Sequence, residues 1–313
     1  MNCMKKMMIL AAAALFAVSA AGCGDSGKPA SSASSNAGGK DGVFTIAYAP
    51  NESNTEAADA RKGLAKDLGA ALGCEVKEIQ ASDYNAIIEA LRTGKADMAY
   101  MGSQALALGV ERTKLEPIVM KAVNGDREKA VYHSVLITSS KNDNINTIQD
   151  IKGKTMAFVD PDSTSGNLVP SAEIIKAFAA DNLNSDMLHT NGKFFEAVSF
   201  SGSHQAGLQA VIKGDVDVAP ISDQILAAEI ANGHASKDAV KIIHTSAAIP
   251  AECMVVAEDV SPEVRKKLSD FLVSYDNKQY FKDVIKVPDA RFISCSMDDY
   301  KDIIELNKII NAF

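Results

Sequence analysis

Residues 90–104, ALRTGKADMAYMGSQ, recur in form further along the chain as residues 210–224, AVIKGDVDVAPISDQ. Each stretch reads as the end of a helix, a glycine, two residues, an aspartate and an apolar strand, followed by a polar loop. Two stretches of this form predict two α/β halves of similar build. Because ligands of such sheets collect outside the carboxyl ends of the strands, the loops at 102–104 and 222–224 are expected to face a shared crevice.

Short apolar runs alternate with amphipathic stretches on both sides of these segments. Strands are expected at 43–49, 76–81, 98–101, 118–123, 131–138, 155–159, 197–200, 216–221, 240–244 and 254–257. Helices are expected at 57–72, 84–93, 165–181, 205–213, 223–232, 261–274 and 298–312. This alternation is typical of α/β layers and predicts a mainly parallel sheet.

The composition excludes several classes of protein. The chain has 313 residues, 47% of them hydrophobic, which suits a globular protein of two domains and not a disordered chain. A net charge of −8 and the absence of Trp argue against a nucleic-acid partner. The five Cys form no CxxC pair, so neither a metal site nor a cofactor is predicted. Cys74, Cys253 and Cys295 are expected to be small buried hydrophobic residues.

The first 42 residues are expected to direct and tether the protein and to lie outside its fold. The apolar run at 9–18 follows two lysines and is too short to cross a hydrocarbon core of ~30 Å, so residues 1–22 predict a signal peptide. The small residues that end at Cys23 resemble the bacterial lipobox, in which this cysteine is acylated and becomes the mature N-terminus. Residues 23–42 are rich in Gly and Ser and predict a flexible, lipid-anchored tether. The alternative is an ordinary secreted protein that is cleaved nearby.

The segment DPDSTSG at 160–166 follows a predicted strand and precedes a predicted helix. The hydroxyls of Ser163, Thr164 and Ser165, with the free N–H groups of a helix N-terminus, suit a tetrahedral oxyanion. Gly166 allows the backbone to approach closely. Helix capping is the alternative interpretation, but a cap needs only one hydroxyl. The segment contains no Lys or Arg and lacks the GxxxxGK[ST] pattern of a nucleotide-binding loop, so it favours reversible capture of an anion over chemistry.

Residues 160–170, DPDSTSGNLVP, resemble the DPxSTSGxLVP signature of PhnD-type solute-binding proteins, which serve ABC importers of phosphonate, phosphite and related phosphorus oxyanions. The resemblance extends to SDY at 82–84, YHSVLI at 132–137 and IPAE at 249–252, in the order found in the family. It covers the chain from about residue 43 to residue 293.

The resemblance implies a type II periplasmic-binding-protein fold, in which two α/β lobes are joined by two crossovers and close over a ligand. The crossovers are expected near 139–141 and 245–248. Lobe 1 would then comprise residues 43–139 and 248–313, and lobe 2 residues 140–247.

The resemblance also implies which residues bind the ligand. The set comprises Ser163, Thr164 and Ser165, the tyrosines Tyr84 and Tyr132, and His204, Glu252 and Gln224. In family members that take aminoalkylphosphonates, two acidic residues face the amine; one position falls on Glu252, but the other falls on Gln224, which leaves such a ligand open. Tyr100 is a further candidate for the lining. The alternatives are core aromatics at the tyrosine positions, a helix-start residue at His204 and a strand-edge charge at Glu252.

The implied function is capture of a phosphorus oxyanion outside the cytoplasm and its delivery to an ABC permease and its ATPase. The protein would act as a monomer held at the membrane by lipid on Cys23. A sulfonate or another small anion as the ligand, or a sensor that uses the same fold, are the alternatives. An enzyme with Ser163 as nucleophile and His204 as base is not expected, because no third orienting residue or metal-binding set is evident.

Overall fold

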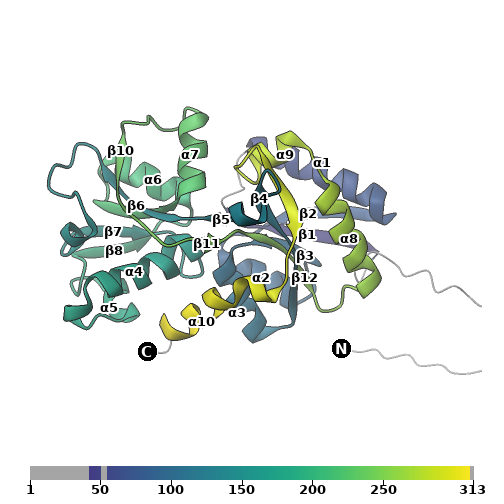
Figure 1. Cartoon of the computed structure of the whole chain (residues 1–313), viewed down its shortest axis with the longest axis horizontal. Helices are drawn as coiled ribbons and strands as arrows, with labels where there is room; N and C mark the ends of the chain where they lie inside the picture. Colours follow the sequence, from purple (N-terminus) through teal and green to yellow (C-terminus); the bar gives the residue numbers. More distant parts are fainter. Residues whose placement is uncertain (1–41, 51–54, 311–313) are drawn as a thin grey trace, which may run out of the picture. The chain divides into compact units, whose positions relative to one another are not determined.

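The computed structural model describes residues 42–50 and 55–310, which form two lobes, each built on one β-sheet (Figure 1). The predicted signal peptide, Cys23 and nearly all of the predicted tether lie outside the described residues. Within the described part of the chain, no helix combines the length and apolar character that crossing a membrane requires.

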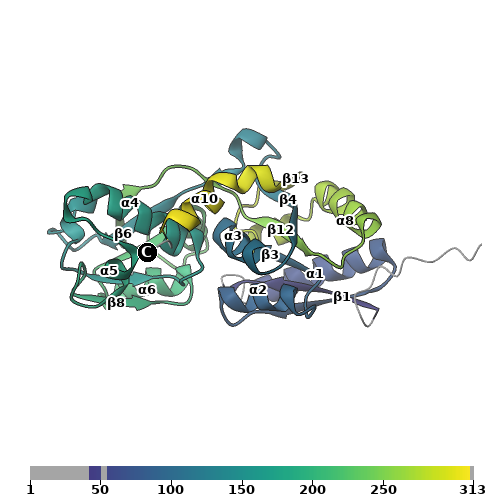
Figure 2. The same ribbon diagram turned by 90° about the horizontal axis from the view of Figure 1, so that it is seen from below.

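Lobe 1 is built on a six-stranded sheet with the order β13-β4-β12-β3-β1-β2. Its strands are β1 (Val43–Tyr48), β2 (Glu75–Gln80), β3 (Met98–Met101), β4 (Leu115–Val123), β12 (Cys253–Ala257) and β13 (Ala290–Ser294). The helices α1 (Thr55–Leu72), α8 (Pro262–Ser274) and α9 (Lys278–Asp283) pack on one face of the sheet, and α2 (Tyr84–Arg92) and α3 (Ser103–Arg112) on the other. The C-terminal helix α10 (Lys301–Ile310) lies beside α3 (Figures 1 and 2).

Lobe 2 is built on a five-stranded sheet with the order β10-β6-β9-β7-β8. Its strands are β6 (Ser134–Ser139), β7 (Thr155–Phe158), β8 (Ala197–Phe200), β9 (Val218–Ser222) and β10 (Val240–Thr245). The helices α4 (Val169–Ala177) and α5 (Ser185–His189) cover one face, and α6 (His204–Lys213) and α7 (Asp223–Ala231) cover the other. Short helical turns occur at η2 (Arg127–Lys129), η3 (Ile148–Ile151), η4 (Thr164–Leu168), η5 (Ala179–Asp181) and η6 (Met297–Tyr300).

The chain passes between the lobes as two short antiparallel strands, β5 (Val131–Tyr132) and β11 (Ile249–Pro250) (Figure 1). The sequence places the first crossover near 139–141 and the end of the first lobe-1 segment at 139. However, β6 already pairs with β9 and β10 in the sheet of lobe 2, so the chain crosses before Ser134. The expected single strand at 131–138 is therefore two strands that belong to different sheets.

The prediction of a mainly parallel sheet is wrong, because both sheets are mixed. In lobe 1, β1 pairs in parallel with β2 and β3, but β12 is antiparallel to β3 and β4. In lobe 2, β7 is parallel to β8 and β9, but β6 is antiparallel to β9 and β10. β6 and β12 are the first strands of their sheets after the chain crosses between the lobes. Each runs antiparallel to the strands of its sheet that are linked through helices.

The expected helix at 165–181 is broken into η4, α4 and η5. η4 is a wide turn of π type, in which the carbonyl of Ser163 accepts from the N–H groups of both Asn167 and Leu168, at 3.0 and 3.1 Å. Pro170 has no N–H to donate to the carbonyl of Gly166 one turn earlier, and that carbonyl instead accepts from Val159 N–H at 3.0 Å. This bond ties the start of the helix to the end of β7.

Candidate functional site

A cavity of about 30 Å³ lies between the lobes, and residues of both lobes line it. The lining residues are Ala49, Tyr84, Tyr100, Met101, Gly102, Tyr132, Ser163, Thr164, Ser165, His204 and Glu252. Seven of the eight predicted ligand-binding residues are among them, as is Tyr100; Gln224 is not.

A wider groove of about 780 Å³ lies on lobe 1 and includes residues 113–117 and 258–262. It contains none of the predicted residues, and Arg265 in its wall pairs with Glu116. We therefore take the smaller cavity as the candidate site, because the predicted ligand-binding residues line it.

The serine–threonine turn between β7 and η4 forms the lobe-2 wall of the cavity. Ser163 Oγ accepts from Gly166 N–H at 3.1 Å and so caps η4, while Thr164 Oγ1 accepts from Gln104 N–H of lobe 1 at 2.9 Å. In both contacts the hydroxyl oxygen accepts, which leaves the hydroxyl proton to donate. The capping interpretation thus holds for Ser163 without removing it as a donor.

Gly166 allows this turn to sit against the end of β7. A Cβ atom at this position would lie 2.3 Å from Cβ of Val159, closer than any side chain tolerates. The predicted close approach of the backbone is therefore an approach to the preceding strand.

His204 is the first residue of α6 and is 3% exposed. The backbone N–H of Ser222 donates to its Nδ1 at 3.2 Å, and its Nε2 lies 3.4 Å from Ser165 Oγ. Burial, together with the positive charge of Lys121, lowers the pKa of His204 to about 3. The imidazole is therefore neutral at pH 7 and carries its hydrogen on Nε2, which faces the serine–threonine turn.

The phenol groups of Tyr84 and Tyr132 both line this cavity. Tyr84 begins α2, where Asp83 caps the helix by accepting from Ala86 N–H at 2.7 Å. Tyr132 lies in the crossover strand β5, and the hydroxyls of Thr164 and Ser165 hydrogen-bond to its oxygen. Burial and the charge of Glu252 hold the pKa of Tyr132 well above its usual range, so its phenol stays protonated.

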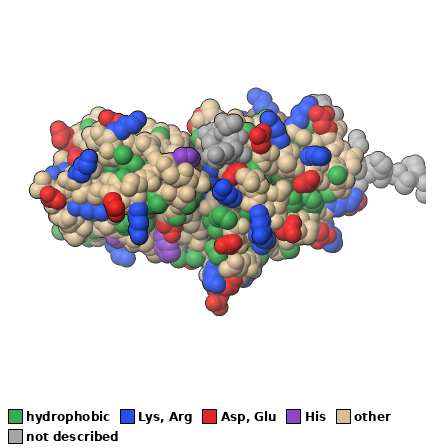
Figure 3. All heavy atoms as spheres, turned by 90° about the horizontal axis from the view of Figure 1, so that it is seen from above, with side chains coloured by type: hydrophobic (Ala, Val, Ile, Leu, Met, Phe, Trp, Pro, Cys, Tyr) green, Lys and Arg blue, Asp and Glu red, His purple; other side chains and the backbone are tan. Residues whose placement is uncertain are grey.

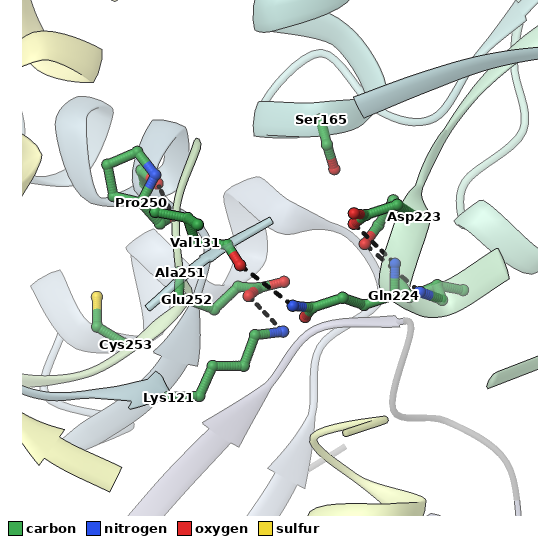
Figure 4. Close-up of polar contacts among 12 residues, drawn as sticks. Lys121, Val131, Ser165, Asp223, Gln224, Pro250, Ala251, Glu252 and Cys253 are labelled. Carbon is green, nitrogen blue, oxygen red and sulfur yellow. Dashed lines mark hydrogen bonds and ion pairs between the residues drawn. The ribbon is translucent and has the colours of Figure 1, made fainter. Parts of the chain in front are cut away.

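Glu252 forms an ion pair with a residue that the sequence did not single out. Lys121 Nζ lies 2.6 Å from Glu252 Oε2, and the side chains are 5% and 18% exposed (Figure 4). Gln224 approaches the pair from lobe 2, and its Nε2 donates to the carbonyl of Val131 at 3.3 Å (Figure 4). Lys121 lies within the apolar strand β4. A lysine inside an apolar strand is unusual, and this is the sequence signal that could have identified it as a functional residue.

The polar loops of the two similar segments both reach the site. In lobe 1, Gln104 N–H bonds to Thr164, and its Nε2 donates to Pro161 O at 3.0 Å. In lobe 2, the backbone N–H of Ser222 donates a hydrogen bond to Nδ1 of His204. The carboxylate of Asp160 also accepts from the backbone N–H of Tyr84 across the lobes. Of the two loops expected to share a crevice, loop 102–104 contributes Gly102 to the cavity lining, whereas loop 222–224 contacts the site through His204 and contributes no lining residue.

Residues 46–300 match the family described as the ABC transporter, phosphonate, periplasmic substrate-binding protein. The chain belongs to this family. The resemblance given by the sequence motifs is confirmed, as is the expectation that the protein is not an enzyme, because the family is a substrate-binding component of a transporter.

Relatives and solved structures agree with membership of the phosphonate-binding family. The chain is 30% identical to the phosphate-import protein PhnD of Mycolicibacterium smegmatis over 280 residues, which cover 88% of this chain and 84% of that protein. It is 29% identical to the phosphonates-binding periplasmic protein of Escherichia coli over 226 residues, covering 71% and 62%. A phosphonate-transporter binding protein of Pseudomonas aeruginosa superposes with a TM-score of 0.73 at 26% identity, covering 85% and 86%.

The fold is also that of PhnD1 from Prochlorococcus marinus in complex with methylphosphonate, with a TM-score of 0.73 at 20% identity and coverage of 87% and 99%. The predicted type II periplasmic-binding-protein fold of two α/β lobes is confirmed. The protein is an extracytoplasmic binding protein, as its family is.

Most of the polar groups that line this cavity are neutral hydrogen-bond donors. Hydroxyls, phenols and a neutral imidazole line it together with the carboxylate of Glu252, and the lining includes neither Lys nor Arg among the described residues. The described residues also include no group of three His, Cys, Asp or Glu side chains that could hold a metal ion. Such a lining suits an oxyanion that is bound by hydrogen bonds and released again.

Proposed function

We propose that this protein captures a phosphorus oxyanion, such as phosphate, phosphite or a phosphonate, and delivers it to an ABC permease and its ATPase. The convergence of neutral donors from both lobes on one small cavity carries the proposal. The relatives named for phosphate import and for phosphonate binding support the same ligand class.

The roles of the site residues follow from their positions. Ser163, Thr164 and Ser165 donate to the phosphorus oxygens from lobe 2, with the free N–H groups of the η4 N-terminus beside them. Tyr84 and Tyr132 donate from lobe 1 and the crossover, and His204 donates through Nε2–H. We assign Glu252 to the end of the cavity that faces the substituent of the ligand, with Gln224 outside the lining beside it (Figure 4).

Closure follows from this division of the donors. A ligand that hydrogen-bonds to both lobes has more contacts when the lobes are together, so it stabilises the closed form by its differential affinity. The permease then distinguishes the closed, loaded protein from the open one.

Titration calorimetry with phosphate, phosphite, methylphosphonate and 2-aminoethylphosphonate tests the function, with sulfate and methanesulfonate as the competing anions. We expect saturable binding of at least one phosphorus oxyanion and weaker binding of the sulfur oxyanions. Binding of sulfonates alone, or of none of the six, would contradict the proposal.

Substitution of Thr164 tests the assignment of the site. Thr164→Val removes one hydroxyl and should weaken binding by about 1.5–3 kcal/mol, the range for a hydrogen bond to a charged group. Thr164→Ser keeps the hydroxyl and is the matched control, which should retain most of the affinity. Equal affinity of the Val and Ser variants would remove Thr164 from the site.

We further propose that the protein acts as a monomer tethered to the membrane by lipid on Cys23. The lipobox-like sequence before Cys23 and the Gly/Ser-rich residues 24–42 support the anchor. Cys23→Ser should abolish incorporation of a labelled fatty acid and release the protein from the membrane fraction. Membrane retention of an unlabelled Cys23→Ser protein would contradict the anchor.

A further inference from the structure

The buried ion pair at the cavity is the feature that the proposed function leaves unexplained. Lys121 comes from β4, and Glu252 lies between β11 and β12. The two residues are neighbours across the sheet, since Lys121 N–H donates to Glu252 O at 3.2 Å. Lys121 Nζ also lies 5.5 Å from the centre of the Tyr132 ring, which leaves it enclosed by the carboxylate and an aromatic face.

A carboxylate in the wall of an oxyanion site is unfavourable by itself. Glu252 is the single acidic residue among the described residues that line the cavity, and its charge would repel an anion bound a few ångströms away. A buried ion pair is also a weak source of stability, because both charges lose their hydration. The pair therefore calls for an explanation in terms of the ligand.

The position of Lys121 supplies that explanation. Its ammonium lies behind the lining and neutralises Glu252 from inside the protein, and its charge reaches the cavity. From lobe 2, Gln224 brings a neutral amide to this region (Figure 4), and the neighbouring carboxylate of Asp223 contacts His133. Among the other titratable groups near the pair, His204, Tyr132 and Cys253 are neutral at pH 7.

We propose that the Lys121–Glu252 pair makes the site selective for phosphorus oxyanions that carry no cationic substituent. The ammonium of Lys121 pairs with the carboxylate of Glu252, so a ligand without positive charge leaves no unpaired carboxylate in the wall. The ammonium of an aminoalkylphosphonate would have to compete with Lys121 for the same carboxylate. Lys121 is thus a specificity-determining residue that acts through Glu252, and this inference rests on the proposed function.

The test compares the affinities of methylphosphonate and 2-aminoethylphosphonate for wild type and variants by titration calorimetry. Wild type should bind methylphosphonate at least tenfold more tightly. Lys121→Met leaves the carboxylate without its partner, so the ratio of the two affinities should shift at least tenfold towards 2-aminoethylphosphonate. Lys114→Met is the matched control, because Lys114 forms an exposed ion pair with Glu258 at the same 2.6 Å distance; its ratio should be that of wild type.

The double variant Lys121→Met/Glu252→Gln completes the cycle and keeps the test valid if Lys121→Met is too unstable to measure. It removes both charges and should bind methylphosphonate at least fivefold more tightly than Lys121→Met does. If that single variant does not fold, the double variant should fold and still prefer methylphosphonate to 2-aminoethylphosphonate, since no carboxylate remains for the amine.

Two results would overturn the inference and leave the proposed function intact: a wild type that prefers 2-aminoethylphosphonate, or a Lys121→Met variant whose ratio is unchanged. A double variant that prefers 2-aminoethylphosphonate would also overturn it. A wild type that binds none of the phosphorus oxyanions would instead refute the proposed function itself.

Discussion

At the scale of single residues, most of the polar side chains that line the cavity stay neutral. Burial keeps His204 and Tyr132 uncharged, although each could carry charge at some pH. A neutral donor binds an anion without forming a permanent ion pair, so the affinity is set by the number and direction of hydrogen bonds. This arrangement also has a consequence for stability, because burying His204 without a charge makes its protonation unfavourable in the folded state.

His204→Gln should therefore alter the pH dependence of folding. The pKa of His204 is about 3 in the folded protein and about 6.5 in an unfolded chain, so on acidification the unfolded state takes up the proton first. The contribution of His204 to stability is complete above pH 6.5 and is lost as the pH falls towards 3. Between pH 7.0 and 4.5, wild type should lose about 2–3 kcal/mol more unfolding free energy than His204→Gln. Urea unfolding at both pH values measures this difference, and parallel losses would contradict it.

The sequence predicted most of the polar residues that line the cavity but not the ion pair beside them. Ser163, Thr164 and Ser165 are adjacent in the chain and begin a helix, so their shared direction follows from local geometry. Lys121 and Glu252 are brought together by the pairing of β4 with β12, which periodicity does not reveal. A local sequence pattern can therefore predict the serine–threonine turn as an anion site, whereas the ion pair at Glu252 depends on tertiary structure.

At the scale of elements, strand and helix types were predictable, but strand direction and helix breaks were not. The strand at 197–200 and the helix at 223–232 lie where the pattern predicts them, or within one residue. α9 and β13 were missed, because their short stretches at 278–283 and 290–294 show no long periodicity. The break in the expected helix at 165–181 could not be predicted, because it depends on the hydrogen bond from Val159 N–H to the carbonyl of Gly166, which the sequence does not reveal.

Gly166→Ala tests the tight junction between β7 and η4. The new Cβ would meet Val159 at 2.3 Å, so the junction has to move, and we expect a loss of about 1–3 kcal/mol of unfolding free energy together with weaker ligand binding. Gly63→Ala is the matched control: Gly63 lies inside α1 with open space around its Cβ position, and Ala should stabilise that helix by about 0.5–1 kcal/mol. Chemical denaturation of both variants measures these changes; a Gly166→Ala protein as stable as wild type would show that the junction is not tight.

At the scale of the whole molecule, opposite charges are mixed on the face shown in Figure 3, and the polar residues of the candidate site lie between the lobes. Lys and Arg side chains lie interspersed with Asp and Glu on the face shown in Figure 3, without a continuous basic stripe. A net charge of −8 therefore does not decide which anions bind, because distant surface charges are screened by salt. Direct contacts between the lobes include the hydrogen bonds of Gln104 to Thr164 and Pro161, the contact of Asp160 with Tyr84, and the packing of Ile303 in one apolar cluster with Leu168 and Val169.

Because these bonds join the two lobes, they contribute to closure as well as to the shape of the cavity. Gln104→Ala removes the bond from Nε2 to Pro161 O and leaves the backbone bond to Thr164. A closed form that has lost one hydrogen bond is less populated, so the apparent ligand Kd should rise about 2- to 10-fold, the equivalent of 0.5–1.5 kcal/mol. Small-angle X-ray scattering should show a larger average radius of gyration at subsaturating ligand concentration than for wild type.

Gln149→Ala provides the control for loss of a glutamine amide bond, since Gln149 Nε2 donates to Ala177 O within lobe 2. This variant should keep both the wild-type Kd and the wild-type scattering curve. If Gln104→Ala also behaved as wild type, the bond from Gln104 Nε2 to Pro161 O would play no part in closure. A raised Kd without any change in scattering would instead assign Gln104 to the cavity wall.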